Sequence, residues 1–501
     1  MQTVVRCALG PILTLLLLAG CSSGGGNSAA QTNPNPPQPA TTAVTLMLSS
    51  SADDELTEFD VQLVSVSLSN AAGKQVSVLS QTRAPEFVHV NGTNEPLLTA
   101  QLPQDTYTGA TVTVGSADFV CLTLDPGSTI DVSEFAYGQT PTADVTVTLP
   151  APIVVSRAPL GLTLALSVSK SASYDLCGAT FTFAITPTFT LSAFAYSPLP
   201  GAAASAAVVA LDGQVSALDA DSMGFAITLP SEASVHVSVG GATAWQGITA
   251  LTDLKAGTFV DLDGTVQQDG SVAATRVAVA DPAAVDVLRG TLFYVSNAAP
   301  TFEMQSREAQ GPDHRSDSEI LDLSSTTFAV SGALASLHSL PFAATFTAQN
   351  MVPGQVVAVT TPAFAYARTY VAAANTVTLM PQTINGKVTG VSMSGDFTVY
   401  SVALGTYDAF PAFATVEGQT TLLTNPGVVE VYTDTATAML TAAAPAPGDT
   451  LRFSGLVFND QGTLRMDCAQ VSPGVTQLSE TTNPLISAVR PPGHEPALGP
   501  H

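Results

Sequence analysis

Hydrophobic and polar residues alternate over short stretches along most of the chain after residue 43, and this pattern predicts β-strands. In residues 61–68, Val64, Val66 and Leu68 share one face while serines occupy the other, as in a strand with one buried side. Ala72-Gly73 follows as a hairpin turn signal. Because helical periodicity never extends beyond two turns, the pattern favours an all-β chain whose residues 43–197 form a β-sandwich.

A pattern of glycines recurs three times after a Pro/Ala-rich linker that ends near residue 207. Each copy opens with a glycine in a strand-like stretch, and the first and third close with two glycines seven residues apart. The second copy has Thr361 where the last glycine would fall. A glycine at the end of a short strand is typical of a barrel strand that bends sharply. The copies span 208–282, 286–380 and 382–474, with glycines Gly213, Gly257 and Gly264, then Gly290 and Gly354, then Gly386, Gly448 and Gly455.

Two parts of the chain resemble known families. The glycine repeat resembles domain of unknown function 5666, which implies about three small barrels like the oligonucleotide/oligosaccharide-binding (OB) barrel, the second divergent. Residues 53–68 and 97–107 resemble domain of unknown function 4382, although Asp105 stands where that family carries a glycine. That family occurs in bacterial lipoproteins and is thought to be prealbumin-like. The resemblance therefore implies a prealbumin-like sandwich in 43–197, and it identifies no catalytic residue.

The N-terminus carries the features of a lipoprotein signal peptide. Residues 1–20 contain one basic residue, Arg6, and an aliphatic run over 12–18. This run is too short to span a membrane, which takes about 20 apolar residues, and it suits a secretory signal. Leu18-Ala19-Gly20-Cys21 resembles the lipobox of bacterial lipoproteins. The resemblance implies that Cys21 is lipidated and becomes the first mature residue. The alternative is a plain signal peptide with an incidental cysteine.

A lipid on Cys21 would place the protein in the cell envelope. Ser22 and Ser23 follow the cysteine, and no Asp, the residue linked to inner-membrane retention, comes directly after it. We therefore expect an outer-membrane lipoprotein, facing either the periplasm or the exterior. Residues 21–42 then comprise the lipid anchor and a Gly/Ser/Pro-rich flexible linker. The Pro/Gly-rich residues 475–501 predict a disordered tail.

The charge of the chain narrows its range of partners. The net charge is −25, although only 11% of residues are charged. A polyanion repels phosphate backbones, so we expect no nucleic-acid partner. The chain also lacks a basic surface for anionic lipids, so the N-terminal lipid must provide the membrane attachment. A glycan or another envelope protein is then the expected partner.

The cysteines allow one disulfide in the mature domains. Cys7 leaves with the signal peptide and Cys21 is the anchor. Cys121 and Cys177 lie in strand-like stretches of one domain in an oxidising compartment, so we predict a disulfide between them. Cys468 is then the unpaired thiol, and its strand position suggests that it is buried.

The histidines and acidic pairs show no spacing typical of catalysis or metal binding. His89 and His236 each lie between valines, and we interpret both as half-exposed strand residues. Asp261 and Asp263 resemble the opening of a calcium loop but lack the remaining ligands of that motif, so we interpret them as outward-facing strand residues. A surface calcium site at Asp53-Asp54-Glu55 is an alternative to a solvated loop. We assign no metal site and no cofactor.

Residues 304–322 form the most polar stretch of the mature chain and are predicted as an insert between the first two strands of the second repeat. An insert at a barrel rim is a common place for binding residues. Its candidates are Arg307, Asp313, His314 and Arg315, and the alternative is a long mobile loop.

The sequence favours a binding function over catalysis. It contains no Gly-x-Ser-x-Gly elbow, phosphate-binding loop or cysteine pair at zinc spacing. We therefore predict a non-enzymatic binding or spacer protein without catalytic residues. The alternative is a hydrolase of polysaccharides, or an accessory unit of one. Such an enzyme would need two carboxylates about 5–10 Å apart, which sequence alone cannot place.

Overall fold

A computed structural model gives the fold of the chain. It describes residues 40–475 apart from 53–55, 125–129, 138–142, 175–182, 197–205, 222, 312–317, 334–336, 338, 363–370, 407 and 415–421. Strands dominate and the helices are very short, which confirms the predicted all-β class. Within these ranges, no helix has the length and hydrophobicity needed to cross a bilayer.

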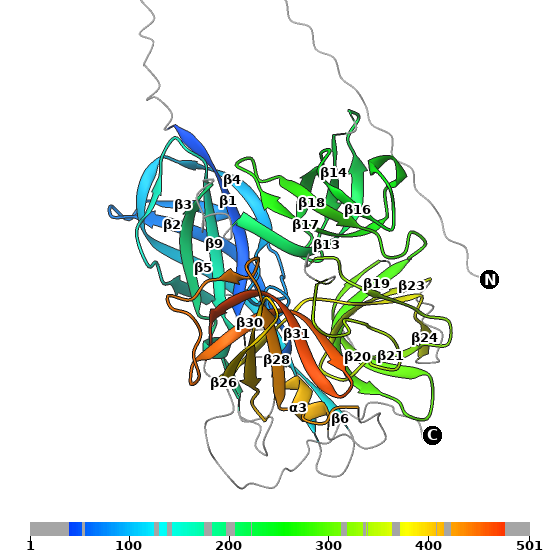
Figure 1. Cartoon of the computed structure of the whole chain (residues 1–501). Coiled ribbons are helices and arrows are strands. Elements are labelled where there is room, and N and C mark those ends of the chain that lie inside the picture. The colour runs from blue at the N-terminus through cyan, green and yellow to red at the C-terminus, as the bar shows by residue number, and fades with distance from the viewer. Residues whose placement is uncertain are drawn as a thin grey trace, which may run out of the picture. The chain divides into compact units, whose positions relative to one another are not determined.

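The first domain is a β-sandwich, as predicted (Figure 1), and its two sheets share one buried hydrophobic cluster. One sheet has the strand order β12–β9–β1–β4, and the other has the order β3–β2–β5–β6 with β7 and β8 paired to β5. Strand β1 runs parallel to β9 and antiparallel to β4. The bounds are β1 (Thr41–Ser51), β2 (Leu56–Asn70), β3 (Gln75–Leu79), β4 (Glu95–Pro103), β5 (Asp105–Leu124), β6 (Ile130–Tyr137), β7 (Ala143–Val147), β8 (Ile153–Val155), β9 (Leu160–Ser167), α1 (Val168–Ser171), β10 (Ala172–Tyr174), β11 (Phe183–Ile185) and β12 (Phe189–Ala195).

The first repeat forms a closed five-stranded barrel, which we name barrel 1, and it matches the predicted OB-like form. Antiparallel pairs join β15 to β14, β14 to β13, β13 to β17 and β17 to β18. A parallel pair between β15 and β18 closes the ring. The bounds are β13 (Ala207–Leu218), β14 (Gly224–Thr228), β15 (Ser234–Ser238), β16 (Ala244–Gln246), η1 (Leu251–Asp253), β17 (Phe259–Val266) and β18 (Val272–Ala278).

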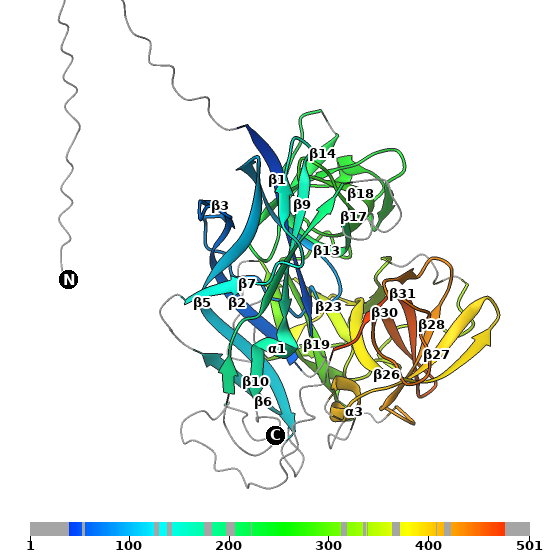
Figure 2. The same ribbon diagram turned by 90° about the vertical axis from the view of Figure 1, so that its left-hand side faces the viewer.

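The other two repeats, barrel 2 and barrel 3, follow the same topology. Figure 2 shows the strands of barrel 3, from β26 to β31, grouped together. In barrel 3 a parallel β28–β31 pair closes the ring. In barrel 2 the last strand is split, so that β24 pairs with β21 while β25 pairs with β22 and β23. The sequence divergence of the second copy therefore includes this split strand. The bounds are β19 (Asp286–Val295), β20 (Thr301–Gln310), β21 (Ser318–Asp322), β22 (Thr327–Val330), β23 (Val356–Thr361), β24 (Val371–Ala373), β25 (Thr376–Leu379), β26 (Gln382–Ser394), β27 (Phe397–Ala403), α3 (Ala409–Phe413), β28 (Val428–Thr433), β29 (Ala438–Met439), β30 (Thr450–Asp460) and β31 (Thr463–Pro473).

The second glycine of each closing pair stands where a side chain would collide with a neighbouring strand. A Cβ at Gly264 would lie 2.5 Å from the Ala273 carbonyl oxygen, and one at Gly455 would overlap the Asp467 carbonyl. Both glycines lie at register shifts, between residues 263 and 264 and between 454 and 455. A bulge next to a glycine lets the strand bend and the partner strand approach closely.

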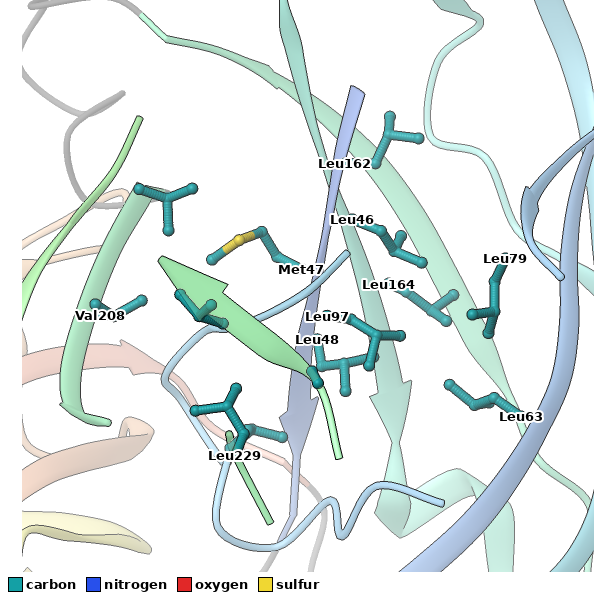
Figure 3. Close-up of a cluster of buried hydrophobic side chains, with 14 of the residues drawn as sticks. Leu46, Met47, Leu48, Leu63, Leu79, Leu97, Leu162, Leu164, Val208 and Leu229 are labelled. Atoms are coloured by element: carbon teal, nitrogen blue, oxygen red, sulfur yellow. The ribbon is translucent and has the colours of Figure 1, made fainter. Parts of the chain in front are cut away.

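The four domains pack as two hydrophobic halves. The sandwich and barrel 1 share one buried cluster, and Figure 3 shows Met47 on the opposite side of β1 from Leu46, toward Val208 and Leu229 of barrel 1. Barrel 2 likewise includes Phe458 of β30 in its core. We call the sandwich with barrel 1 the first half, and barrel 2 with barrel 3 the second half.

The prediction that residues 304–322 form a polar insert between two strands is wrong. Residues 304–310 belong to β20 and residues 318–322 form β21. Arg307 is only 8% exposed, so its charge serves an internal contact and does not mark a solvated loop. Asp313, His314 and Arg315 lie outside the described residues, so their predicted role in binding stays a prediction.

Candidate functional site

His89 lies at the centre of a buried cluster of carboxylates. Its Nδ1 is 3.2 Å from a Glu86 oxygen and 3.2 Å from a Glu308 oxygen, and its Nε2 is 2.8 Å from Glu95. All four side chains are less than a tenth exposed. The interpretation of His89 as a half-exposed strand residue is therefore wrong: Val88-His89-Val90 is part of the loop between β3 and β4, and alternation does not set side-chain direction in a loop.

The loop is folded around the Glu86 carboxylate. Its Oε1 accepts hydrogen bonds from the backbone N–H groups of Phe59 at 2.8 Å and Val88 at 2.6 Å, and its Oε2 accepts one from the His89 N–H at 2.7 Å. Burial alone would raise the pKa of Glu86. The hydrogen bond from His89 and the positive charges of His89 and Arg307 outweigh burial and lower this pKa.

The cluster keeps His89 positively charged. Burial acts to lower the pKa of His89, but the carboxylates of Glu308, Glu95 and Glu86 raise it well above the ordinary value of 6.5. Burial and the other carboxylates also raise the pKa of Glu308, against the opposing charges of His89 and Arg289. The imidazolium therefore links carboxylates of the sandwich to one of barrel 2.

A β-bulge in β20 directs two charges of barrel 2 toward the sandwich. Arg289 of β19 pairs with Glu308, and Gly290 pairs with Ser306, so Arg307 is the extra residue. The Arg307 guanidinium approaches Glu86 with Nε 4.0 Å from its oxygen. Bulges commonly re-aim a side chain in this way. The polar run that suggested an exposed loop is therefore an interdomain contact.

Barrel 1 and barrel 3 join the same region of the sandwich. Arg289 Nη1 lies 2.5 Å from Asp212 of β13, and Ser231 of barrel 1 donates a 2.9 Å hydrogen bond to Glu95. Arg452 of barrel 3 donates to Asn91 Oδ1 at 2.7 Å, and burial lowers the pKa of Arg452 to about 10. Charged and polar contacts therefore connect the first half to the second, together with a small hydrophobic cluster of Ala210, Val356 and Met380. Larger hydrophobic clusters hold each half together.

Two cavities adjoin this network. The smaller, of about 70 Å³, is bordered by His89, Glu95, Arg289 and Glu308 and has room for only a few water molecules. The larger, of about 270 Å³, lies between barrel 1 and barrel 2. We call the larger one the seam groove, because it separates the two halves. Its wall includes Phe259, Val260, Asp261, Arg276 and Val279 from barrel 1, and Val330, Ala358, Thr378 and Met380 from barrel 2.

The polar end of the seam groove is a cross-strand group on the outer face of barrel 1. Asp212 pairs with Asp261 across β13 and β17, and Asp263 pairs with Arg276 across β17 and β18. Arg276 binds both Asp261 and Asp263. Burial and the neighbouring aspartates raise the pKa of Asp261 to about 7, against the opposing charge of Arg276. As predicted, Asp261 and Asp263 face outward, on either side of the buried Leu262.

The predicted cysteine chemistry falls largely outside this site. Cys468 is free and buried, as expected, and burial raises its pKa. Cys121 lies in β5, whereas Cys177 and Cys21 lie outside the described residues, so the disulfide and the lipidation stay predictions. His236 lies in β15 with its side chain 48% exposed, which confirms its predicted half-exposed strand position. The residues that the structure describes contain no group of three or more potential ligands arranged to hold a metal.

One comparison with known families gives a match. The family model described as "Domain of unknown function (DUF5666)" matches residues 212–278, which is most of barrel 1. No curated protein matches the chain. The resemblance noted from the glycine pattern is therefore supported for the first repeat.

Proposed function

We propose that the chain is a lipid-anchored, non-enzymatic binding protein of the bacterial cell envelope, and that the seam groove holds its ligand. The observation that carries the proposal is the mostly apolar space of about 270 Å³ between two barrels. Ligand sites are typically concave and mostly apolar, and they occur preferentially at domain boundaries. The lipobox-like residues ending at Cys21 and the resemblance to domain of unknown function 4382 support the envelope location and the outer-membrane anchor.

The charged residues near His89 suit a structural role better than a catalytic one. Glu86, Glu95 and Glu308 all contact the same imidazole and are 5–6% exposed. Their low exposure leaves little carboxylate surface for a substrate to contact. The adjacent cavity of about 70 Å³ is also too small for a sugar ring together with an attacking water. These side chains hold the two halves in position, while the seam groove beside them stays accessible.

A fluorescent apolar probe tests the proposal. Residues 21–501 with Cys21→Ser would be purified without the lipid; this retains the compact unit that starts at Ala40. N-phenyl-1-naphthylamine should bind with increased emission, because the groove excludes water from it. Ala329→Trp, which fills the groove from β22, should abolish the increase. The matched control Ala226→Trp, on β14 away from the groove lining, should retain it.

Three results would contradict the proposal. The first is no probe binding to the unsubstituted protein, and the second is binding that survives Ala329→Trp. The third is turnover of cell-wall or external polysaccharides by the purified protein, which would favour the hydrolase alternative. A glycan or an envelope protein as partner would be detected by the same Ala329→Trp comparison on glycan arrays and in envelope pull-downs.

A further inference from the structure

We infer that the seam groove takes a cationic ligand, a primary amine carried on an apolar body. This inference rests on the proposed binding function of the groove and adds the chemical class of the ligand.

The accessible charges of the groove wall are carboxylates. Asp212 and Asp261 face each other across adjacent strands, with their side chains 16% and 19% exposed. Asp281 lines the same groove. Arg276, which also lines the groove, has a side chain only 6% exposed and is shared between Asp261 and Asp263, and Asp212 is paired with the buried Arg289. The carboxylates of Asp212, Asp261, Asp263 and Asp281 still outnumber these two guanidiniums, and a positive group is complementary to the excess negative charge.

Three polar atoms of this wall lack hydrogen-bond partners among the described residues. They are Asp261 Oδ2, Gln310 Oε1 and Arg276 Nη1, and Arg276 as a whole is only 5% exposed. Buried polar atoms in proteins are nearly always paired, so two unpaired acceptors and an unpaired donor in the wall of a cavity indicate an unfilled polar position. An ammonium would donate to Asp261 Oδ2, and a water held beside it could accept from Arg276 Nη1.

The remainder of the groove suits an apolar body. Val260 and Val279 line it from barrel 1, and Val330, Ala358 and Met380 line it from barrel 2. An anionic ligand of the same shape would be placed against Asp212 and Asp261. A cation with no apolar part would leave these side chains uncovered. The proposed ligand therefore needs both a positive group and an apolar body.

The protonation of Asp261 supports the inference independently of ligand shape. Burial, together with the charges of Asp212 and Asp263, raises its pKa to about 7. A nearby ammonium favours the ionised carboxylate, so amine binding should release a proton at neutral pH. The affinity of the groove for the amine should fall as the pH drops below 7, because an amine with a pKa near 10 stays charged while Asp261 becomes neutral.

Three probes with the same body and different head groups test the inference. They are 3-phenylpropylamine, 3-phenylpropanamide and 3-phenylpropanoate, titrated calorimetrically into residues 21–501 carrying Cys21→Ser at pH 8. We expect the amine to bind tightest and the carboxylate weakest. Asp261→Asn should weaken the amine by on the order of tenfold and leave the amide within twofold. Asp219→Asn, which removes an equal charge from outside the groove lining, should change neither.

The outcomes separate this inference from the proposed function. Equal or tighter binding of the carboxylate or the amide, blocked by Ala329→Trp, would overturn the amine inference and leave the groove as a binding site. Failure of all three probes to bind would overturn both. If Asp261→Asn does not fold, the unsubstituted protein decides. Amine affinity that does not fall between pH 8 and pH 6 contradicts the inference, and a fall confined to the amine supports it.

Discussion

His89 of the sandwich and Glu308 of barrel 2 face each other at 3.2 Å, and each side chain is less than a tenth exposed. This pair brings together a loop and a strand 219 positions apart in the chain. Because Glu86 and Glu95 contact the same ring, the positive charge of His89 balances carboxylates from both halves. The charge of one imidazole therefore contributes to the contact between the halves.

The first prediction concerns the pH dependence of stability. The folded pKa of His89 is raised well above 6.5, so its contribution is fully present below about pH 6.5 and is lost as the pH rises through the folded pKa. We expect the melting temperature to fall with rising pH in that interval. The measurement is calorimetry between pH 6 and pH 10.

His89→Gln removes the titrating group and keeps a polar side chain of similar reach. It should lower stability at pH 6 by about 3–5 kcal/mol, because buried carboxylates lose their counter-charge, and it should flatten the pH dependence above pH 6.5. The control is His236→Gln, which alters a half-exposed histidine and should change little. A pH profile that is identical with and without His89 would refute the assignment.

The second prediction concerns the glycines of the barrel bends. Gly455→Ala places a Cβ against the Asp467 carbonyl, and such overpacking typically destabilises by about 1–3 kcal/mol. Gly240→Ala is the matched control, because its Cβ would meet nothing within 4 Å. It should shift stability by less than about 0.5 kcal/mol. Chemical denaturation of both variants measures the difference, and equal effects would count against the bend interpretation.

The third prediction concerns the lipid anchor. Cys21→Ala should move the protein from the membrane fraction to the aqueous phase in detergent partitioning, because no other membrane attachment is proposed. Ser22→Ala is the control and should remain with the membranes. Continued partitioning of Cys21→Ala into the detergent phase would contradict the lipoprotein assignment.

The fourth prediction concerns the cysteines. Non-reducing peptide mapping should find Cys121 joined to Cys177, a link that stabilises by about 3–4 kcal/mol for a loop of this length in the chain-entropy model. Cys468 should resist alkylation until the protein unfolds, because it is buried and its pKa is raised. Rapid alkylation of Cys121 in the native exported protein would exclude the disulfide.

The strands and barrels can be predicted from local sequence patterns. Alternation marks a strand such as residues 61–68, and the spacing of Gly257 and Gly264 marks a turn and a bend, with Gly257 at φ +89°. Each signal depends on neighbouring residues, so it can be recognised without knowing the tertiary structure.

The charge network does not follow from local signals. The surroundings of His89 include Glu308, which is distant in sequence, and the turn that holds His89 depends on the Glu86 carboxylate. The polar setting of Arg307 makes it stand out in the sequence, but polarity alone does not distinguish a solvated loop from a buried ion pair. A bulge, which places Arg307 against the sandwich, depends on strand pairing that no short stretch encodes.

The division into two hydrophobic halves has a mechanical consequence if the proposed anchor holds the chain at its N-terminus. Ion pairs and polar contacts such as Arg289 with Asp212 and Arg452 with Asn91 link the halves beside one small hydrophobic cluster, and salt and water weaken the polar contacts once they open. A pull between Ala40 and barrel 3 should therefore separate the halves before any barrel unravels. Optical-tweezer traces should show an early rupture whose force falls with added salt, followed by salt-insensitive unfolding of each half. The boundary between the halves would then open first under load, while both halves stay folded and able to rejoin.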